Sequence, residues 1–130
     1  MEAAAQEEMT AEEYRRLKKK GNKYGAHPVT DIESGVTFDS TAEYKRYDSL
    51  RLLEKGGAIC GLLIHVIYPF VINGILVCQY ESDFVYMSDG VLVVEDVKSK
   101  ATRTPAYSIK RKLMKAVYGI RITEVDSRNV

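Results

Sequence analysis

Two aspartates and a lysine near the middle of the chain have the types and spacing of half of a metal site. Asp83 begins one strand-like segment, and Asp96 and Lys98 end the next. Asp89-Gly90 between them favours a two-residue type I′ turn, because both turn positions require positive φ. A hairpin closed in this way places Asp83 opposite Asp96 and puts Lys98 on the same face. Opposed carboxylates repel each other, and a divalent cation between them would remove that penalty.

The length of this turn decides which carboxylate faces Asp83. In a two-residue turn the partner is Asp96, and Glu95 points to the other face of the strand. A three-residue loop over residues 88–90 would instead bring Glu95 opposite Asp83 and into the cleft. We expect Asp96, because it shares a strand face with Lys98 whereas Glu95 does not.

Length and composition indicate one globular domain behind a charged N-terminal segment. The chain has 130 residues, of which 45% are hydrophobic and 28% are charged, as in ordinary globular domains. We expect residues 1–28 to form a charged helix and a basic arm, and residues 29–130 to form the domain. The acidic N-terminus lacks the apolar segment of a signal peptide, and the apolar run 62–72 is far shorter than the ~20 residues of a spanning helix. These features predict an intracellular protein without membrane contact.

Helix caps, apolar runs and turn dipeptides predict an α/β fold with a mixed sheet. Ser40 followed by Glu43 is typical of a helix N-terminus, and Thr104-Pro105 marks the start of a second helix. The last strand follows that helix, so a crossover connection returns it to the sheet. The elements expected before the central hairpin are a short hairpin within 29–38, a helix from Ser40 to Lys55, a strand over 59–68 that Pro69 interrupts, a turn at Asn73-Gly74 and a strand from Ile75 towards Asp83. Those expected after it are a helix from Thr104 to Gly119, with Ala106, Ile109, Leu113 and Val117 facing the core, and a strand over 120–125.

Glu43 and His65 are further candidates for the cleft, and each has a purely structural alternative. Glu43 has the position of a capping-box glutamate. It also falls within the apolar stripe of its helix, where a lone carboxylate is costly without a partner. His65 lies in an apolar strand, so it is either a hydrogen-bonded core histidine or a residue that lines the cleft.

Basic side chains are concentrated after the predicted site. From Lys98 to Lys115 the chain carries seven lysines and arginines and no acidic residue. A block of this kind indicates a polyanionic partner, although part of it is expected to form a solvated helix face. The residues expected to contact nucleic acid are Lys100, Arg103, Lys110, Arg111 and Lys115, together with Lys20 and Lys23 of the N-terminal arm.

The same pattern resembles the restriction-endonuclease-like PD-(D/E)XK nuclease superfamily, and within it a group of small phage-encoded proteins. The resemblance covers about residues 38–125 and is carried by segments 37–47, 83–86 and 93–98. In that superfamily an αβββαβ core, with a mixed central sheet flanked by helices, holds the acidic residues and the lysine. Ser82 stands where the motif often has proline, and Ser99 stands where glycine is frequent.

The resemblance implies a site for Mg²⁺, for which Mn²⁺ would substitute. Asp83, Asp96 and the backbone carbonyl of Val97 would be ligands, and Glu43 would complete the shell directly or through water. The metal would activate water for phosphodiester hydrolysis. Lys98 would orient or deprotonate that water, or stabilise charge on the phosphate.

The function implied by the resemblance is that of a Mg²⁺-dependent DNA endonuclease in the cytoplasm of the host cell. Structure-selective cleavage of branched or junction DNA, in phage recombination or replication, is the expected activity. A homodimer would suit paired cuts in two strands. The alternative is a non-catalytic accessory factor on the same fold, which binds nucleic acid or uses its N-terminal helix to bind a phage or host protein.

Overall fold

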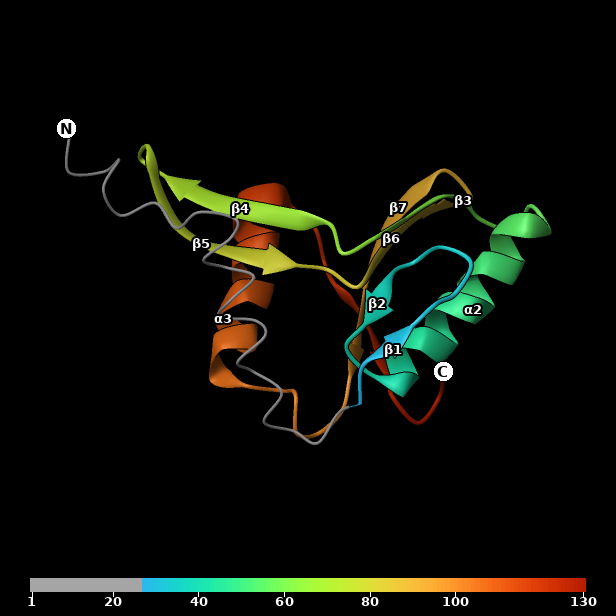
Figure 1. Ribbon diagram of the computed structural model, residues 1–130. Helices are drawn as coiled ribbons and strands as arrows, with labels where there is room; N and C mark the ends of the chain where they lie inside the picture. The colour runs from blue at the N-terminus through green and yellow to red at the C-terminus, as the bar shows by residue number, and fades with distance from the viewer. Residues whose placement is uncertain (1–26) are drawn as a thin grey trace.

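The computed structural model describes residues 27–130, and Figure 1 shows its helices and strands. The helix and most of the basic arm expected in residues 1–28, with Lys20 and Lys23, lie outside the described residues. Among the described residues, no helix is long and apolar enough to cross a membrane.

A four-stranded mixed sheet forms the centre of the domain. It consists of β3 (Cys60–Ile64), β6 (Phe84–Ser88), β7 (Val91–Lys98) and β8 (Thr123–Asp126), in the order β3-β6-β7-β8. The β3–β6 and β6–β7 pairs are antiparallel, whereas β7 and β8 are parallel. The parallel pair follows from the helical crossover between them. The expected α/β fold with a mixed sheet is therefore confirmed.

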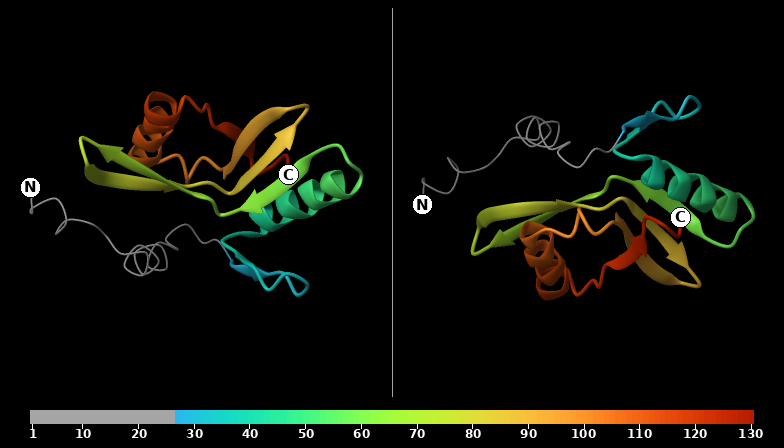
Figure 2. Two further views of the ribbon diagram at one scale, coloured as in Figure 1. Left: turned by 90° about the horizontal axis from the view of Figure 1, so that it is seen from above. Right: turned by 90° about the horizontal axis from the view of Figure 1, so that it is seen from below.

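Two helices lie on opposite sides of this sheet (Figure 2). One is α2 (Thr41–Lys55), which begins where the Ser40 hydroxyl accepts the Glu43 amide proton. The other is α3 (Pro105–Leu113), which begins at Thr104 and continues as a π-helical turn, η2 (Met114–Tyr118), up to Gly119. Both helices begin where the sequence predicted. Their N-cap side chains accept hydrogen bonds from backbone amides of the first turn, so the start of each helix depends on local sequence.

The expected strand over 59–68 is instead broken at His65, whose φ of 52° lies in the left-handed region. After the break, β4 (Ile67–Ile72) and β5 (Ile75–Glu81) form a separate two-stranded ribbon that crosses in front of the helix containing α3 in Figure 1. Pro69 lies within β4 instead of interrupting it. A proline without an amide proton is tolerated there because β4 pairs with β5 alone and leaves an edge free. Near the start of the domain, β1 (Val29–Thr30) and β2 (Thr37–Phe38) form the expected short hairpin.

Each face of the sheet buries its own apolar cluster. On one face Val85 and Val94 pack with the ribbon and α3, and on the other Phe84 and Tyr86 pack against α2. Of the stripe expected to face the core from the second helix, Leu113 packs against the core as predicted. The prediction is wrong for Ala106, Ile109 and Val117, which are exposed, while Tyr107 and Met114 are buried instead. The buried residues on the α3 face are Phe70, Tyr80, Val85, Val94, Tyr107, Met114 and Ile122, and those on the α2 face are Phe38, Leu50, Ile59, Phe84 and Tyr86.

Candidate active site

The β6–β7 hairpin has a two-residue turn. Asp89 and Gly90 have φ values of 50° and 76°, and Ser88 pairs with Val91. These values fit the type I′ turn expected from the dipeptide. Phe84 pairs with Glu95, so the next position places Asp83 beside Asp96, and the three-residue loop is excluded.

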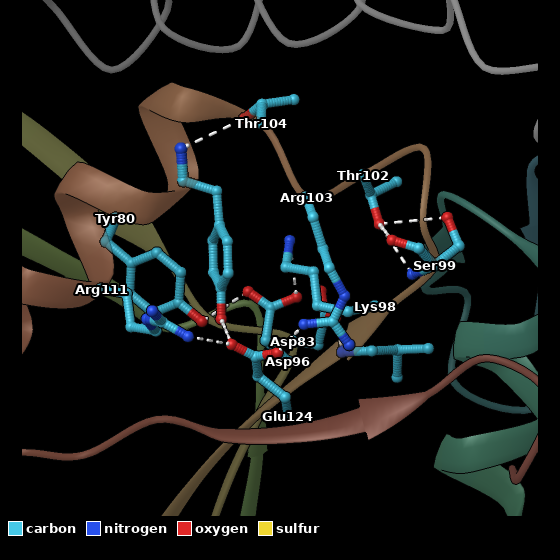
Figure 3. Close-up of polar contacts among 12 residues, drawn as sticks. Tyr80, Asp83, Asp96, Lys98, Ser99, Thr102, Arg103, Thr104, Arg111 and Glu124 are labelled. Carbon is cyan, nitrogen blue, oxygen red and sulfur yellow. Dashed lines mark hydrogen bonds and ion pairs between the residues drawn. The ribbon is translucent and has the colours of Figure 1, made fainter.

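Asp83, Asp96 and Lys98 come together on the α3 face of the sheet (Figure 3). The strand register places Asp83 next to Asp96, and the charge of Asp96 acts on the Asp83 carboxylate. Asp83 Oδ2 accepts the Val97 amide proton at 2.7 Å, and Lys98 Nζ lies 3.2 Å from Asp96 Oδ1. The predicted register, with Asp83 beside Asp96 and Lys98 close to Asp96, is confirmed.

The electrostatics of this cluster favour a cation. Burial, the charge of Asp96 and the charge of Glu43 raise the pKa of Asp83 well above its ordinary value, against a smaller lowering by the Val97 amide. The protonated form of Asp83 is therefore stabilised in the folded protein. A divalent cation would compensate the same repulsion and favour the ionised form.

Replacing Asp83 with asparagine is expected to stabilise the metal-free protein near pH 7. Folding raises the pKa of Asp83, so the protonated side chain favours the folded state. This gain in the free energy of unfolding is complete below the unfolded pKa of about 3.9 and is lost as pH rises through the folded pKa. Asparagine removes this loss, which for opposed like charges is roughly 0.2–1 kcal/mol. Urea unfolding in EDTA between pH 5 and pH 8 should show a gain for Asp83→Asn that shrinks towards acid pH. A gain that is the same at every pH would contradict the repulsion described here.

Glu95 does not enter the site and belongs to the opposite face. Its buried carboxylate accepts two hydrogen bonds from Arg46, at 2.8 and 2.7 Å, and one from the Tyr86 hydroxyl. Burial and the hydrogen bond to Glu95 raise the pKa of Tyr86 to about 12. The alternative that placed Glu95 in the cleft is therefore wrong, because the side chains of adjacent strand residues point to opposite faces.

Removing Arg46 is expected to destabilise the domain strongly. Arg46→Met would leave the Glu95 carboxylate buried without its cation, at a cost of about 3 kcal/mol. Chemical denaturation of wild type, Arg46→Met and the double variant Arg46→Met/Glu95→Gln measures this cost. The double variant should recover much of the loss, since its buried side chain is neutral. A single variant as stable as wild type would show that Glu95 tolerates burial without Arg46.

The buried Glu43 and the partly buried His65 form a pair next to the carboxylate cluster. Glu43 is 4% exposed, and its Oε1 lies 2.7 Å from His65 Nε2. The backbone amide of His65 donates to the carbonyl of Asp83 at 3.1 Å. The Glu43 amide also donates to Ser40, so the residue both caps the helix and directs its carboxylate inward. His65 thus borders the site, and its left-handed backbone marks the end of β3.

Three residues absent from the sequence-based site complete its lining. Tyr80 Oη donates to Asp96 Oδ2 at 2.6 Å, and Lys98 Nζ lies 3.8 Å from the centre of the Tyr107 ring. Glu124 pairs in register with Asp96 on the parallel strand β8. Glu124 could have been identified from the sequence if the parallel register of the last strand against β7 had been predicted. Nothing local marks Tyr80 or Tyr107 among nine tyrosines.

Glu124 forms ion pairs with the two arginines that were expected to contact nucleic acid. Its carboxylate accepts hydrogen bonds from Arg103, from Arg111 at 2.9 Å and from the Tyr107 hydroxyl at 3.1 Å. Partial burial acts to raise the pKa of Glu124, but these hydrogen bonds outweigh it and lower the pKa. About half of each arginine side chain remains exposed, at the rim of the site. Of the other predicted contacts, Lys100 and Lys115 are exposed and Lys110 is partly exposed.

The few carboxylates at this site are better suited to Mg²⁺, which keeps several water ligands, than to a metal whose ligands all come from the protein. In the described part of the chain, no three carboxylate, histidine or cysteine side chains converge to hold a metal by themselves. Mg²⁺ commonly binds through one or two carboxylates and keeps several waters. Asp83 and Asp96 provide such a pair, and Glu43 is turned towards His65.

Comparison with known proteins identifies one family. The profile of a family described as "Protein of unknown function (DUF1064)" matches residues 21–126, which include every element from β1 to β8. No curated protein and no solved structure matches the chain.

Proposed function

The chain belongs to the DUF1064 family, and we propose that it is a Mg²⁺-dependent DNA endonuclease that hydrolyses phosphodiester bonds. In this proposal α2, β3, β6, β7, α3 and β8 correspond, in chain order, to the αβββαβ core of restriction-endonuclease-like enzymes. The β4–β5 ribbon is then an insertion between the first and second core strands. Branched or junction DNA of a phage replication or recombination step is the proposed substrate.

The observation that carries the proposal is the pairing of Asp83 with Asp96 next to Lys98. A carboxylate whose pKa is raised by burial and by a neighbouring carboxylate, as for Asp83 beside Asp96, is unfavourable in a metal-free protein. Such arrangements are concentrated at functional sites, where they bind cations or carry out proton transfer. A lysine within 3.2 Å of one carboxylate adds the positive charge needed beside a scissile phosphate.

The residues of the site have separate tasks in this mechanism. Asp83 and Asp96 would hold Mg²⁺, and Glu43 would contribute through water because its carboxylate is engaged with His65. When bound, the ion would activate water and offset charge that develops on the phosphate. The Lys98 ammonium would orient the attacking water or stabilise the same charge. Asp83 keeps its geometry through the Val97 amide.

The basic residues around the rim would bind the DNA backbone. Arg103 and Arg111 present half of their surface to solvent while Glu124 fixes their guanidinium groups. A phosphate adjacent to the scissile bond would accept hydrogen bonds from both. Lys100 and Lys115 would add sequence-independent attraction that weakens with salt. A homodimer would place two such sites on two strands.

Cleavage assays with the purified full-length chain test this function. Linear duplex, flap and four-way-junction DNA are incubated with the protein in Mg²⁺ or in EDTA, and products are resolved on denaturing gels. Cleavage in Mg²⁺ and none in EDTA is the expected result, with the junction or flap cut faster than the linear duplex. An intact substrate in every Mg²⁺ reaction would refute the nuclease proposal.

A non-catalytic DNA-binding role is the second candidate. It is favoured by the ion pair between Lys98 and Asp96, which already neutralises part of the acidic cluster, and by the exposed arginines at its rim. Salt-dependent binding of junction DNA without cleavage in Mg²⁺ or Mn²⁺ would select this role.

A further inference from the structure

Tyr80 reaches the site from the ribbon, not from the sheet. It is 3% exposed, and its hydroxyl donates to Asp96 Oδ2 while Asp96 Oδ1 faces Lys98. A phenol is protonated near neutral pH, and a carboxylate oxygen can only accept, so the Tyr80 hydroxyl is the donor of this hydrogen bond. The two oxygens of Asp96 are thereby distinguished, because Oδ2 is tied to the ribbon and Oδ1 is directed towards Lys98.

Tyr107 reaches the site from α3 and lies against Lys98. The ammonium group is 3.8 Å from the ring centre, within the range of a cation–π contact. The Tyr107 hydroxyl is fixed by Glu124, and the rings of Tyr80 and Tyr107 are 6.5 Å apart. The two rings are therefore neighbours that support adjacent members of the carboxylate–lysine cluster.

We propose that Tyr80 and Tyr107 are positioning residues of this site, Tyr80 for the metal-binding carboxylate Asp96 and Tyr107 for the ammonium group of Lys98. The inference rests on the proposed metal-dependent function. In metal sites, partners that hydrogen-bond to a ligand set its orientation, and their loss typically costs 10–100-fold in metal affinity. Tyr80 fills that role for Asp96 because its donor occupies one carboxylate oxygen and limits rotation of the group.

The Tyr80 half of the proposal is tested by metal binding alone. Isothermal titration of Mn²⁺ into wild type and Tyr80→Phe, without DNA, should show a roughly tenfold or greater rise in Kd for the variant. Tyr68→Phe is the matched control, because it removes a hydroxyl from the ring stacked on Tyr80 at 6.4 Å. Thermal unfolding in EDTA shows that each variant is folded at the titration temperature; Tyr80→Phe should unfold somewhat earlier, because it loses a buried hydrogen bond. Equal Kd values for Tyr80→Phe and wild type would overturn this half.

The Tyr107 half is tested by separating turnover from binding. Tyr107→Phe keeps the ring under Lys98, whereas Tyr107→Leu and Tyr107→Met fill the space without a ring. A lost cation–π contact should lower kcat by roughly tenfold in the last two, with Mn²⁺ affinity and the KM for DNA unchanged. Tyr107→Phe should restore most of kcat. Equal kcat for the Phe, Leu and Met variants would overturn this half.

Nuclear magnetic resonance gives a second measurement that needs no cleavage. Ring currents should shift the Lys98 ε-methylene protons upfield in wild type and in Tyr107→Phe. Unshifted protons in both proteins would overturn the placement of Lys98. The outcomes also separate the two proposals. A wild-type protein that binds no Mn²⁺ contradicts the metal-dependent function itself, whereas wild-type binding with an unaffected Tyr80→Phe contradicts only the positioning role.

Discussion

Asp96→Asn is expected to lower Mg²⁺-dependent DNA cleavage by at least about 10³-fold, which corresponds to more than 4 kcal/mol of transition-state stabilisation. Asparagine has the shape of aspartate and still accepts the Tyr80 hydroxyl proton. It removes the charge that would bind Mg²⁺ together with Asp83. The rate of cleavage of the best DNA substrate, measured in single-turnover reactions, gives this effect directly.

Asp89→Asn is the matched control for this substitution. Asp89 lies in the turn of the same hairpin and is exposed, and Asn-Gly supports the type I′ turn as well as Asp-Gly does. The control should therefore cleave like wild type. Activity of Asp96→Asn near that of the control would exclude Asp96 from the chemistry.

Metal binding should fail in the same variant. At 100 times its Kd, a metal that binds only the folded state raises the free energy of unfolding by about 2.7 kcal/mol. Wild type and Asp89→Asn should show this increase when Mn²⁺ is added, and Asp96→Asn should show little of it. In EDTA the variant loses both the repulsion with Asp83 and the ion pair with Lys98, so the effect of Mn²⁺ is measured against the metal-free stability of each protein.

Lys98→Met is expected to reduce kcat by about 10³-fold, within the range found for positioned acid–base and electrostatic groups. Lys98 Nζ is 3.2 Å from Asp96 Oδ1, so its ammonium lies where water and phosphate would meet the carboxylates. The same ammonium competes with a metal ion for Asp96. The variant should therefore retain or increase its Mn²⁺ affinity while it loses turnover.

Lys98→Arg separates the two roles open to the lysine. Arginine keeps the positive charge but does not deprotonate in proteins. Partial activity in Lys98→Arg would assign charge stabilisation, and activity as low as in Lys98→Met would assign proton transfer or a position that only lysine can take. Lys55→Met, at the exposed end of α2, is the control for loss of a lysine. Turnover of Lys98→Met equal to that of Lys55→Met would remove Lys98 from the mechanism.

The parts of the site that were predicted correctly depend on short-range chemistry. Asp89 and Gly90 occupy left-handed conformations that few residue types adopt, so the dipeptide determines the turn and with it the register of Asp83 and Asp96. Ser40 and Thr104 each accept an amide proton three residues later. Such contacts depend on neighbours in the chain, which is why they can be recognised without the fold.

The parts that were missed depend on contacts between distant segments. No local pattern breaks the apolar run at His65, where the ribbon leaves the sheet. Because of that break, Tyr80 lies beneath Asp96, sixteen residues away in sequence. The rotation of α3 that buries Tyr107 in place of Ile109 is set by packing against the ribbon and sheet, which the helix periodicity alone does not specify.

Turn chemistry and strand alternation act over a few residues, so they were enough to predict that two carboxylates and a lysine share one face of a hairpin. The surroundings of these three residues depend on the folded arrangement of distant elements. This arrangement directed Glu95 to Arg46 and Glu43 to His65, and it brought Tyr80, Tyr107 and Glu124 to the cluster from three other elements. These partners lie far apart in the sequence and meet only when the chain folds. Each pairing forms because a polar group that becomes buried requires a hydrogen-bond or charge partner.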